Sequence, residues 1–571
     1  MYAVGLSRRT ATRRLAIAVI GALLVGACGG DDDDDDASTN APAATEAATT
    51  QEPTSSTSGE VTPTGSTEDT EVASGDTEAG YQDPAKLEGA NRDGTLTVAW
   101  QLNLATLDPY LNPNVQNVAY NFLVYDALIY RTPDGELLPG LAESWEWSED
   151  GTTFTMQLRE GVQFHDGSTL DASVVKANID RLLGMPTAPV FGGVRNVGSV
   201  EAPDPSTVVF TMKQVDATLP YSLADRAGMI ISGQALADGV DVQATAVGAG
   251  PYKVIDFRAG DGITFERFDG YWGDPNAAAA KRVELVGIPD GQARANGVTT
   301  GGFDAAYITP SQVGQVEDAG VEIVAESNLF FVQTYLNRSR PFFSDFRVSQ
   351  AMSYAIDRDT LCEAIYLGYC EPTFKLFPDD YWAGSPDIPD DYYTYDPEKA
   401  KQLLAEAGYE DGFAFELMIP AGSDPYPQFA ELLQAQWGAI GITVNINPVD
   451  ISQLADTYFG QKQSDALLGG GGQVPEPAQL FQGAYMTTSY ANPGGVTAPG
   501  MDDLVNRMFA ALDQDDRAEL VREATKLVVE NALNEILIAP QVIYGVNDNV
   551  LNWQPNGVAN YPIIRGVGVT D

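Results

Sequence analysis

A change of composition near residue 90 limits what this chain can fold into. Residues 29–90 carry sixteen acidic side chains against a single lysine, and they contain few large apolar residues. Such a segment cannot bury enough apolar surface to offset its chain entropy, so we expect it to be disordered. The folded part must therefore be built from residues 91–571, where apolar and polar residues follow the periods of strands and helices.

The N-terminus has the pattern of an export signal. Four arginines between positions 8 and 14 precede an uncharged run from Leu15 to Ala27, which is shorter than the ~20 residues that span a bilayer. The run ends in Val25-Gly26-Ala27-Cys28, and small residues before a cysteine resemble a bacterial lipobox. The resemblance implies lipidation of Cys28, with an ordinary signal peptide and an incidental cysteine as the alternative. We expect a signal peptide at 1–27 and a lipid-anchored linker at 28–90.

Length and charge narrow the class of protein further. The folded part exceeds the ~250–300 residues at which a single core is usually complete, so we expect at least two lobes. The formal net charge is −48, and such a surface repels the anionic backbone of nucleic acid. Nucleic acid is therefore not expected as a partner.

Two cysteines remain beyond Cys28. Cys362 and Cys370 are eight residues apart, and in an oxidising compartment they are candidates for a disulfide bond. A buried reduced pair is the alternative. A catalytic cysteine is disfavoured, because the only histidine, His165, lies far away in the sequence.

The segment order predicts an α/β fold. "TLTVAWQLN" at 95–103 reads as a strand, and Asp171 is placed to cap a helix that follows the "HDGS" turn. Further on, "FAFELMIP", "PQFAELLQAQWGAIG" and "ITVNINPV" form a strand–helix–strand series typical of a right-handed crossover unit. Residues 504–533 read as one long helical stretch.

Motifs for catalysis and cofactors are missing from the sequence. It contains no phosphate-binding P-loop, no Gly-x-Ser-x-Gly and no His-Glu-x-x-His. We therefore expect no enzyme activity, no cofactor and no metal site. An exported hydrolase that uses a carboxylate pair stays open, since 80 acidic residues form many pairs by chance.

A series of short motifs across residues 95–565 resembles a known family. "LAESWEWSEDGTTFTMQLREGVQFHDG" is followed by "GAGPYKV", "DGYWG", "LNRSRPFFSDFRVSQAMSYAIDRD" and "YDPEKAKQLLAEAGY". Together they are similar to the family 5 extracellular solute-binding proteins of ABC importers, which include oligopeptide-, dipeptide- and nickel-binding members. His165 would then sit in a structural turn of the family's signature segment.

The resemblance implies an α/β, two-lobed clamp like the periplasmic binding proteins (type II, large class). Lobe I would span 91–331 with an extra subdomain at about 126–226, and residues 538–571 would return to it. Lobe II would span 332–537. The chain would cross between the lobes twice, near Phe331–Thr334 and near Glu535–Gln541, and closure about these crossings would trap a ligand.

Ligand contacts are expected on loops that face each other across the lobes. In the first loop we expect Asn112, Asn114 and Asn117, with solvent-facing turn residues as the alternative. Relatives that bind dipeptides have an aspartate for the ligand's amino group in a Gly-rich segment and an arginine for its carboxylate. Here those places hold Gln473 and Asp424. Further candidates for the ligand site are Gly470, Gly471, Gly472, Glu476, Tyr381, Trp382, Tyr426 and Tyr485, with core packing as the alternative for the four aromatic residues.

Both ionic anchors for a free dipeptide are therefore missing or inverted, and a buried ligand charge without a partner is costly. The glycines at 469–472 leave room for a larger ligand. We expect a monomeric substrate-binding lipoprotein on the outer face of the cytoplasmic membrane, in the cell envelope. It would pass oligopeptides rather than strict dipeptides to a permease and its ATPase subunits. A non-peptide solute, such as a cationic small molecule, a glycan or a metal chelate, is the alternative cargo.

Overall fold

The computed structural model describes residues 84–101, 105–112, 118–132, 135–474, 476–554, 556–559 and 561–571. The predicted signal peptide and nearly all of the predicted linker lie outside these residues, as do Cys28, Asn114 and Asn117.

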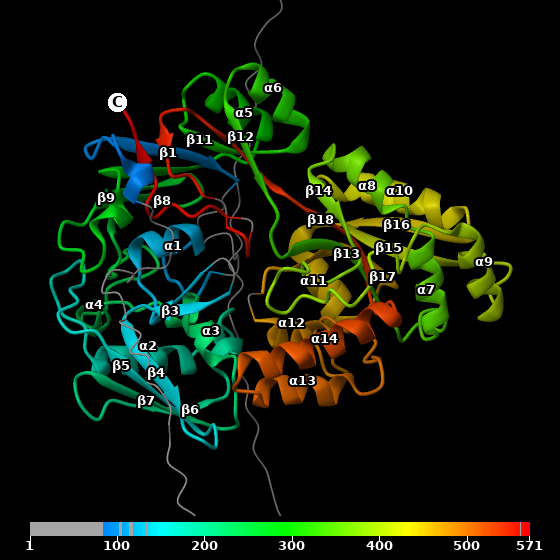
Figure 1. The fold of residues 1–571 in the computed structure, drawn as a ribbon, viewed down its shortest axis with the longest axis horizontal. Helices are drawn as coiled ribbons and strands as arrows, with labels where there is room; N and C mark the ends of the chain where they lie inside the picture. The colour runs from blue at the N-terminus through cyan, green and yellow to red at the C-terminus, as the bar shows by residue number, and fades with distance from the viewer. Residues whose placement is uncertain are drawn as a thin grey trace, which may run out of the picture. The chain divides into compact units, whose positions relative to one another are not determined.

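A seven-stranded mixed sheet forms the centre of lobe I (Figure 1). β1 runs parallel to β10 and β11, and the other neighbours are antiparallel. Leu96, Val98 and Trp100 of β1 are buried in the core, which confirms the predicted first strand. In sheet order the strands are β12 (Glu322–Glu326), β19 (Val542–Val546), β11 (Ala305–Ile308), β1 (Thr95–Trp100), β10 (Arg282–Gly287), β9 (Gly262–Arg267) and β8 (Tyr252–Arg258).

Lobe I also carries a smaller antiparallel sheet. Its order is β4 (Ala142–Trp147), β5 (Thr153–Leu158), β7 (Thr207–Met212) and β6 (Val197–Glu201), and it packs against α2 (Ala172–Leu183). We call this sheet, with the chain from α2 to η4 (Arg226–Gly228), the subdomain. The Asp171 carboxylate accepts the backbone N–H groups of Ser173 at 2.8 Å and Val174 at 3.1 Å, which confirms the predicted helix cap.

A six-stranded sheet forms lobe II. Its order is β14 (Cys370–Pro372), β18 (Glu535–Pro540), β13 (Phe330–Leu336), β17 (Ala466–Gly472), β15 (Phe413–Pro420) and β16 (Ile442–Val449). β15 and β16 are parallel and are joined by α10 (Tyr426–Gly438), so the predicted strand–helix–strand unit is present.

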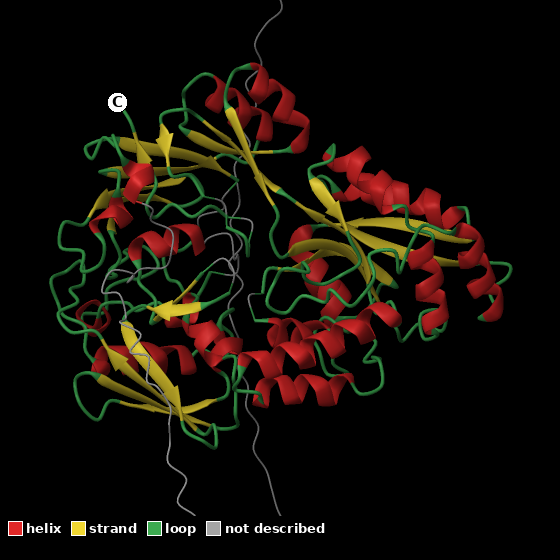
Figure 2. Ribbon diagram, in the orientation of Figure 1, coloured by secondary structure: helices red, strands yellow, loops and turns green. Residues whose placement is uncertain are grey.

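Helices cover both faces of the lobe II sheet (Figure 2). One face packs against α7 (Phe346–Tyr354), α8 (Arg358–Leu361), α9 (Pro397–Glu406) and α10. The other face packs against α12 (Pro477–Ala484), α13 (Met501–Ala510) and α14 (Gln514–Glu530). None of the described helices has the length and apolarity that a bilayer-spanning segment needs.

The remaining elements are short. They are α1 (Val118–Val124), β2 (Ile129–Arg131), β3 (Leu137–Pro139), α3 (Leu219–Leu223), α4 (Gly233–Ala237), α5 (Gly291–Thr299), α6 (Val313–Asp318), α11 (Ile451–Ala455), β20 (Val550–Leu551), β21 (Gly568–Val569) and the helical turns η1 (Pro84–Leu87), η3 (Phe191–Val194), η5 (Pro275–Ala278), η6 (Pro310–Gln312), η7 (Cys362–Tyr366) and η8 (Asp456–Gly460).

The long helix predicted at 504–533 is two helices instead. α13 ends at Ala510 and α14 begins at Gln514. Between them the Asp513 carboxylate accepts the N–H groups of Asp515 and Asp516 at 2.9 and 3.1 Å, so this side chain starts a new helix.

The chain crosses between the two large sheets twice. The first crossing takes residues 327–329, between β12 and β13, and the second takes Gln541 alone, between β18 and β19. The first crossing is therefore earlier than predicted, because Phe331–Thr334 are already paired with β17 inside lobe II.

A disulfide bond lies beside the second crossing. It joins Cys362 to Cys370 and closes a loop that contains Tyr369. The Tyr369 carbonyl accepts the N–H of Gln541 at 3.0 Å, and Cys370 pairs with Pro540 in the sheet. The closed loop thus holds the residue at which the chain passes from lobe II to lobe I.

A buried carboxylate also lies at this end of lobe II. Glu535, the first residue of β18, is completely buried, and Ser353 Oγ donates a hydrogen bond to its Oε2. Burial raises the pKa of Glu535 to about 7, although Ser353 and the guanidinium groups of Arg358 and Arg338 oppose the shift.

This raised pKa predicts a pH dependence of stability. Between the ordinary glutamate pKa and about pH 7 the folded protein holds a proton that the unfolded chain has lost, so the free energy of unfolding should fall as pH rises. Glu535→Gln cannot ionise and should remove this component, which amounts to at most about 3 kcal/mol. Urea unfolding of both proteins at pH 5 and pH 8 checks this; parallel pH profiles would contradict it.

Candidate functional site

The glycine run at the end of β17 is shaped by its neighbour β13. Phe330, Phe331, Val332 and Gln333 pair with Gly472, Gly471, Gly470 and Gly469 in that order. A Cβ on Gly470 would overlap the Phe330 ring, and one on Gly471 would overlap the Gln333 side chain. The space left by the missing side chains is therefore filled by β13, and the glycines do not leave the room for ligand that the sequence suggested.

Gly472 is the most constrained of the four. Its φ is +80°, a region that favours glycine, and a Cβ there would overlap the backbone oxygen of Leu329. Gly469 has no such limit, because a Cβ there would meet only Tyr335 Cε2 at 3.7 Å.

The difference gives a matched pair of variants. Gly472→Ala should lower the free energy of unfolding by about 1–3 kcal/mol from backbone strain alone, and the clash of the new Cβ with the Leu329 oxygen should add to this loss. Gly469→Ala should change it by less than about 1 kcal/mol. Denaturant unfolding measures both, and equal effects of the two substitutions would show that the close approach of β13 to β17 is not the cause.

Gln473 follows the run and lies in a wall between two cavities. Its backbone N–H donates to the Leu329 carbonyl at 3.1 Å, and its φ is +60°. Leu329 lines one cavity, beside the first crossing, and Gln473 lines the other, beside the subdomain. We call them the hinge cavity and the subdomain cavity.

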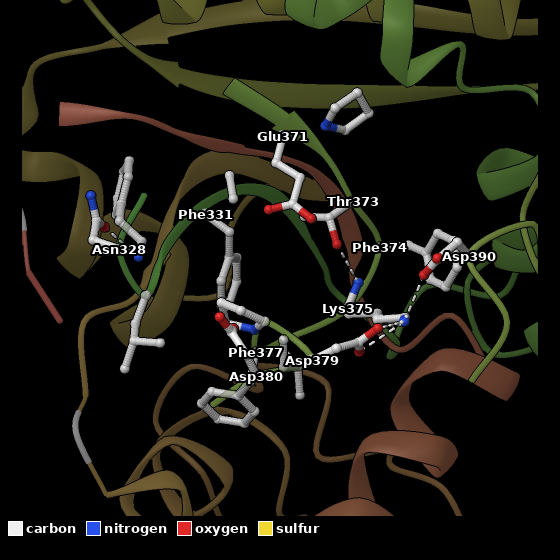
Figure 3. A pocket seen from close by; sticks show the side chains of 16 residues that line it. Asn328, Phe331, Glu371, Thr373, Phe374, Lys375, Phe377, Asp379, Asp380 and Asp390 are labelled. Carbon is white, nitrogen blue, oxygen red and sulfur yellow. Dashed lines mark hydrogen bonds and ion pairs between the residues drawn. The ribbon is translucent and has the colours of Figure 1, made fainter. Parts of the chain in front are cut away.

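The hinge cavity has a volume of about 410 Å³ and acidic walls (Figure 3). Lys375 Nζ bridges Asp379 at 2.8 Å and Asp390 at 2.7 Å, while Glu371 and Asp380 make no ion pair among the described residues. Burial raises the pKa of Glu371, and the nearby charges of Asp379, Asp380 and Asp390 add to the effect. A cationic group would relieve this crowding of negative charge.

Asn328 contributes a polar group to the same cavity. It is almost completely buried, and its Oδ1 accepts the Phe330 N–H at 2.7 Å. Its Nδ2 has no hydrogen-bond partner in the described part of the chain. Asn328 can therefore donate a hydrogen bond to a ligand.

The subdomain cavity, with a volume of about 690 Å³, lies between the lobes. Arg195, Tyr221 and Arg226 line it from lobe I, and Gln473, Gln479 and Gln482 line it from lobe II. Gln479 Nε2 donates across the boundary to Ser222 Oγ at 2.9 Å and to Thr218 Oγ1 at 3.2 Å. The Ala217 N–H donates to the Phe509 carbonyl at 2.9 Å. These contacts hold the subdomain against α12 and α13.

Tyr381 and Trp382, which the sequence predicted as ligand contacts, line neither cavity. They form a row of rings from the hinge cavity to the subdomain cavity: Phe377 to Tyr381 at 5.7 Å, Tyr381 to Trp382 at 5.8 Å, and Trp382 to Tyr221 at 6.4 Å between centroids. Their position between the cavities supports packing rather than direct contact with a solute.

Glu476 also has a structural position instead of the predicted ligand contact. It caps α12, with Oε1 accepting the Ala478 N–H at 3.2 Å, and its Oε2 lies 3.2 Å from Arg517 Nε. Both side chains of this ion pair are buried. The Arg517 guanidinium also contacts the Tyr221 ring of the subdomain, 5.6 Å from its centroid. Both carboxylate oxygens are thus taken up by the protein.

Removing one partner of this pair should be costly. Glu476→Gln leaves the Arg517 charge buried without a counter-charge, and we expect a loss of about 3–5 kcal/mol in the free energy of unfolding. The double variant Glu476→Gln/Arg517→Met removes both charges and should recover most of that loss. Urea unfolding of the three proteins tests this; a double variant no more stable than Glu476→Gln would contradict it.

The other predicted residues lie apart from the two cavities. Asn112 is buried in lobe I, where its Nδ2 donates to Tyr120 Oη and its carbonyl accepts a hydrogen bond from Arg226 Nη1. Asp424 is exposed at the start of α10. Tyr426 packs on the α7–α10 side of lobe II, and Tyr485 is buried against Phe481.

The single histidine is part of a turn. The His165 N–H donates to the Gly248 carbonyl at 2.9 Å, and its Nε2 lies 2.9 Å from the Gly250 carbonyl oxygen. Burial lowers the pKa of His165 to about 4. The residue is therefore neutral near pH 7 and fixes the turn, as predicted. Within the described residues no three His, Cys, Asp or Glu side chains are grouped to hold a metal ion.

Sequence reasoning missed Arg195, Tyr221, Arg226, Glu371 and Gln479. None of them belongs to a motif, and the residues of each cavity wall come from distant segments of the chain.

Comparison with known proteins identifies the family. The model of the bacterial extracellular solute-binding proteins, family 5 (Middle) matches residues 136–492. The chain belongs to this family, whose members are periplasmic or extracellular components of ABC importers. This confirms the resemblance drawn from the motifs.

Individual relatives are binding proteins. The glutathione-binding protein GsiB of Salmonella paratyphi A is 30% identical over 375 residues, which cover 65% of this chain and 72% of that protein. The structure of DppA from Helicobacter pylori in complex with the peptide STSA has a TM-score of 0.73 and 23% identity, covering 85% of this chain and all of the other.

A third relative is NikA from Brucella suis in complex with Fe(III)-EDTA. Its TM-score is 0.72 at 25% identity, over 80% of this chain and 96% of that one. These structures confirm the expected two-lobed fold.

Proposed function

We propose that this protein captures peptides, oligopeptides rather than strict dipeptides, and delivers them to the permease and ATPase subunits of an ABC importer. The observation that carries the proposal is the opposite charge of two neighbouring cavities. The hinge cavity has Glu371 and Asp380, which form no ion pair within the described residues, and the subdomain cavity has Arg195 and Arg226. A peptide has an ammonium group at one end and a carboxylate at the other, so it matches this polarity.

The two cavities are close enough to serve one ligand. Leu329 and Gln473, which line different cavities, are joined by a hydrogen bond. A single extended chain that occupied both cavities would have to run around this wall. A dipeptide would not need two cavities of about 410 and 690 Å³, which favours longer ligands.

Capture needs no covalent step. Residues 327–329 and Gln541 are the connections between the lobes, and rotation about them would open and close the contacts of the subdomain with α12 and α13. The permease would distinguish the closed, loaded form from the open one. Cys28 would anchor the protein in the outer face of the membrane, with residues 29–90 as a tether for a monomer.

The relatives support peptides and leave one alternative. DppA was solved with a peptide and GsiB is named for glutathione, itself a peptide. NikA was solved with a polycarboxylate chelate, and the arginines of the subdomain cavity would suit such an anion as well.

Mass spectrometry of the cargo tests the proposal. The full chain, purified from expressing cells without unfolding, should release a heterogeneous set of peptides of three or more residues. A refolded, empty sample should then bind the most abundant of these peptides in a calorimetric titration. Release of a single non-peptide compound that rebinds, with no binding of peptides, would overturn the peptide assignment.

A further inference from the structure

The subdomain cavity carries net positive charge in a strongly acidic protein. Its charged lining residues are Arg195, Asp225 and Arg226, whereas the whole chain has a net charge of −48. A site that concentrates positive charge against this background favours an anionic group over a cationic one.

Arg226 is held in place by a backbone carbonyl and by an ion pair with its neighbour Asp225. Its Nη1 donates to the carbonyl of Asn112, and its Nε lies 3.4 Å from Asp225 Oδ1, a long contact. The Asp225 carboxylate also accepts the backbone N–H of Arg226. The Arg226 side chain is about nine-tenths buried, so its charge interacts with a nearby anion more strongly than an exposed one would.

Arg195 has no carboxylate partner within the described residues. It follows the turn η3 and lines the cavity with a half-buried side chain. The backbone carbonyl of Arg195 accepts a hydrogen bond from Lys213 Nζ at 2.9 Å. Lys213 likewise has no carboxylate partner within the described residues. Through Arg195 and Arg226 the subdomain therefore presents a positive corner to the cavity.

Neutral amides face this corner from lobe II. Gln473 and Gln482 line the cavity, and their side chains make no hydrogen bonds to other described residues. A carboxylate between the lobes would accept charge-assisted bonds from the arginines and neutral bonds from the amides. Because the donors come from both lobes, an anion there would also favour closure.

We propose that Arg195 and Arg226 recognise the C-terminal carboxylate of the peptide. This inference rests on the peptide function proposed above. It places the carboxylate anchor in lobe I, whereas relatives that bind dipeptides have their arginine at the place of Asp424, in lobe II. Arg195 selects for the free carboxylate, and Arg226 additionally positions Asn112.

Two peptide libraries separate this inference from the peptide function itself. Immobilised full-length protein is equilibrated with degenerate tetrapeptides that end in a free carboxylate, and separately with the same library as C-terminal amides. Retained peptides are quantified by mass spectrometry. The wild-type protein should retain the acids about tenfold to a hundredfold better than the amides, the size of one or two charged hydrogen bonds.

Substitution at Arg195 should change this preference without abolishing peptide binding. Arg195→Gln should reduce the acid-over-amide ratio about tenfold, and Arg195→Glu should favour the amides. Lys281→Gln, which removes an exposed charge elsewhere on lobe I, is the matched control and should keep the wild-type ratio. Circular dichroism checks that each variant is folded.

Each outcome decides a different point. Equal retention of both libraries by the wild type, or an unchanged ratio in Arg195→Glu, would overturn the assignment of the arginines and leave peptide capture standing. Retention of neither library would overturn peptide capture and, with it, this inference.

Discussion

The close approach of β13 to β17 is the contact on which the rest of the site depends. β13 starts immediately after the first crossing, and its pairing with the glycine run places Leu329 against Gln473. With side chains on Gly470 to Gly472, the two strands could not keep this register without displacing Phe330 or Gln333. The wall between the two cavities is therefore a product of backbone packing.

Charge is distributed unevenly around that wall. On the hinge side, one lysine is shared between two aspartates and Glu371 is left among like charges. On the subdomain side, Arg195 and Arg226 face neutral amides. Glu476 and Arg517 neutralise each other between α12 and α14, so this pair adds little net charge to either cavity. The polarity thus comes from residues outside the family motifs.

Local patterns made parts of the fold predictable from the sequence. The cap at Asp171, the β15–α10–β16 unit and the turn at His165 depend on neighbouring residues, and all three are present. The break before α14 was missed, although it too is local: the polar run from Asp513 to Arg517 interrupts the apolar residues, and Asp513 is a helix-capping residue type. The family and the two lobes followed from motif order.

The site was much less predictable, for a physical reason. Glu476 was expected to meet the ligand, but its partner Arg517 is 41 positions further along the chain. Gln473, predicted as a ligand contact, lines the subdomain cavity, whereas Asp424, Tyr426 and Tyr485 line neither cavity. Whether a polar side chain already has a hydrogen-bond or ion-pair partner in the protein depends on distant segments of the chain. A single sequence does not show which of these segments meet.

The disulfide loop has a consequence for where the clamp becomes complete. Gln541 is tied to Tyr369, and Tyr369 lies within the loop closed by Cys362 and Cys370. In a reducing cytoplasm the two thiols would stay separate, and Tyr369, the hydrogen-bond partner of Gln541, would lie on an open segment instead of in a closed loop. The loop that holds the second crossing is therefore closed covalently only in an oxidising compartment, such as the periplasmic or extracellular space in which members of the family work.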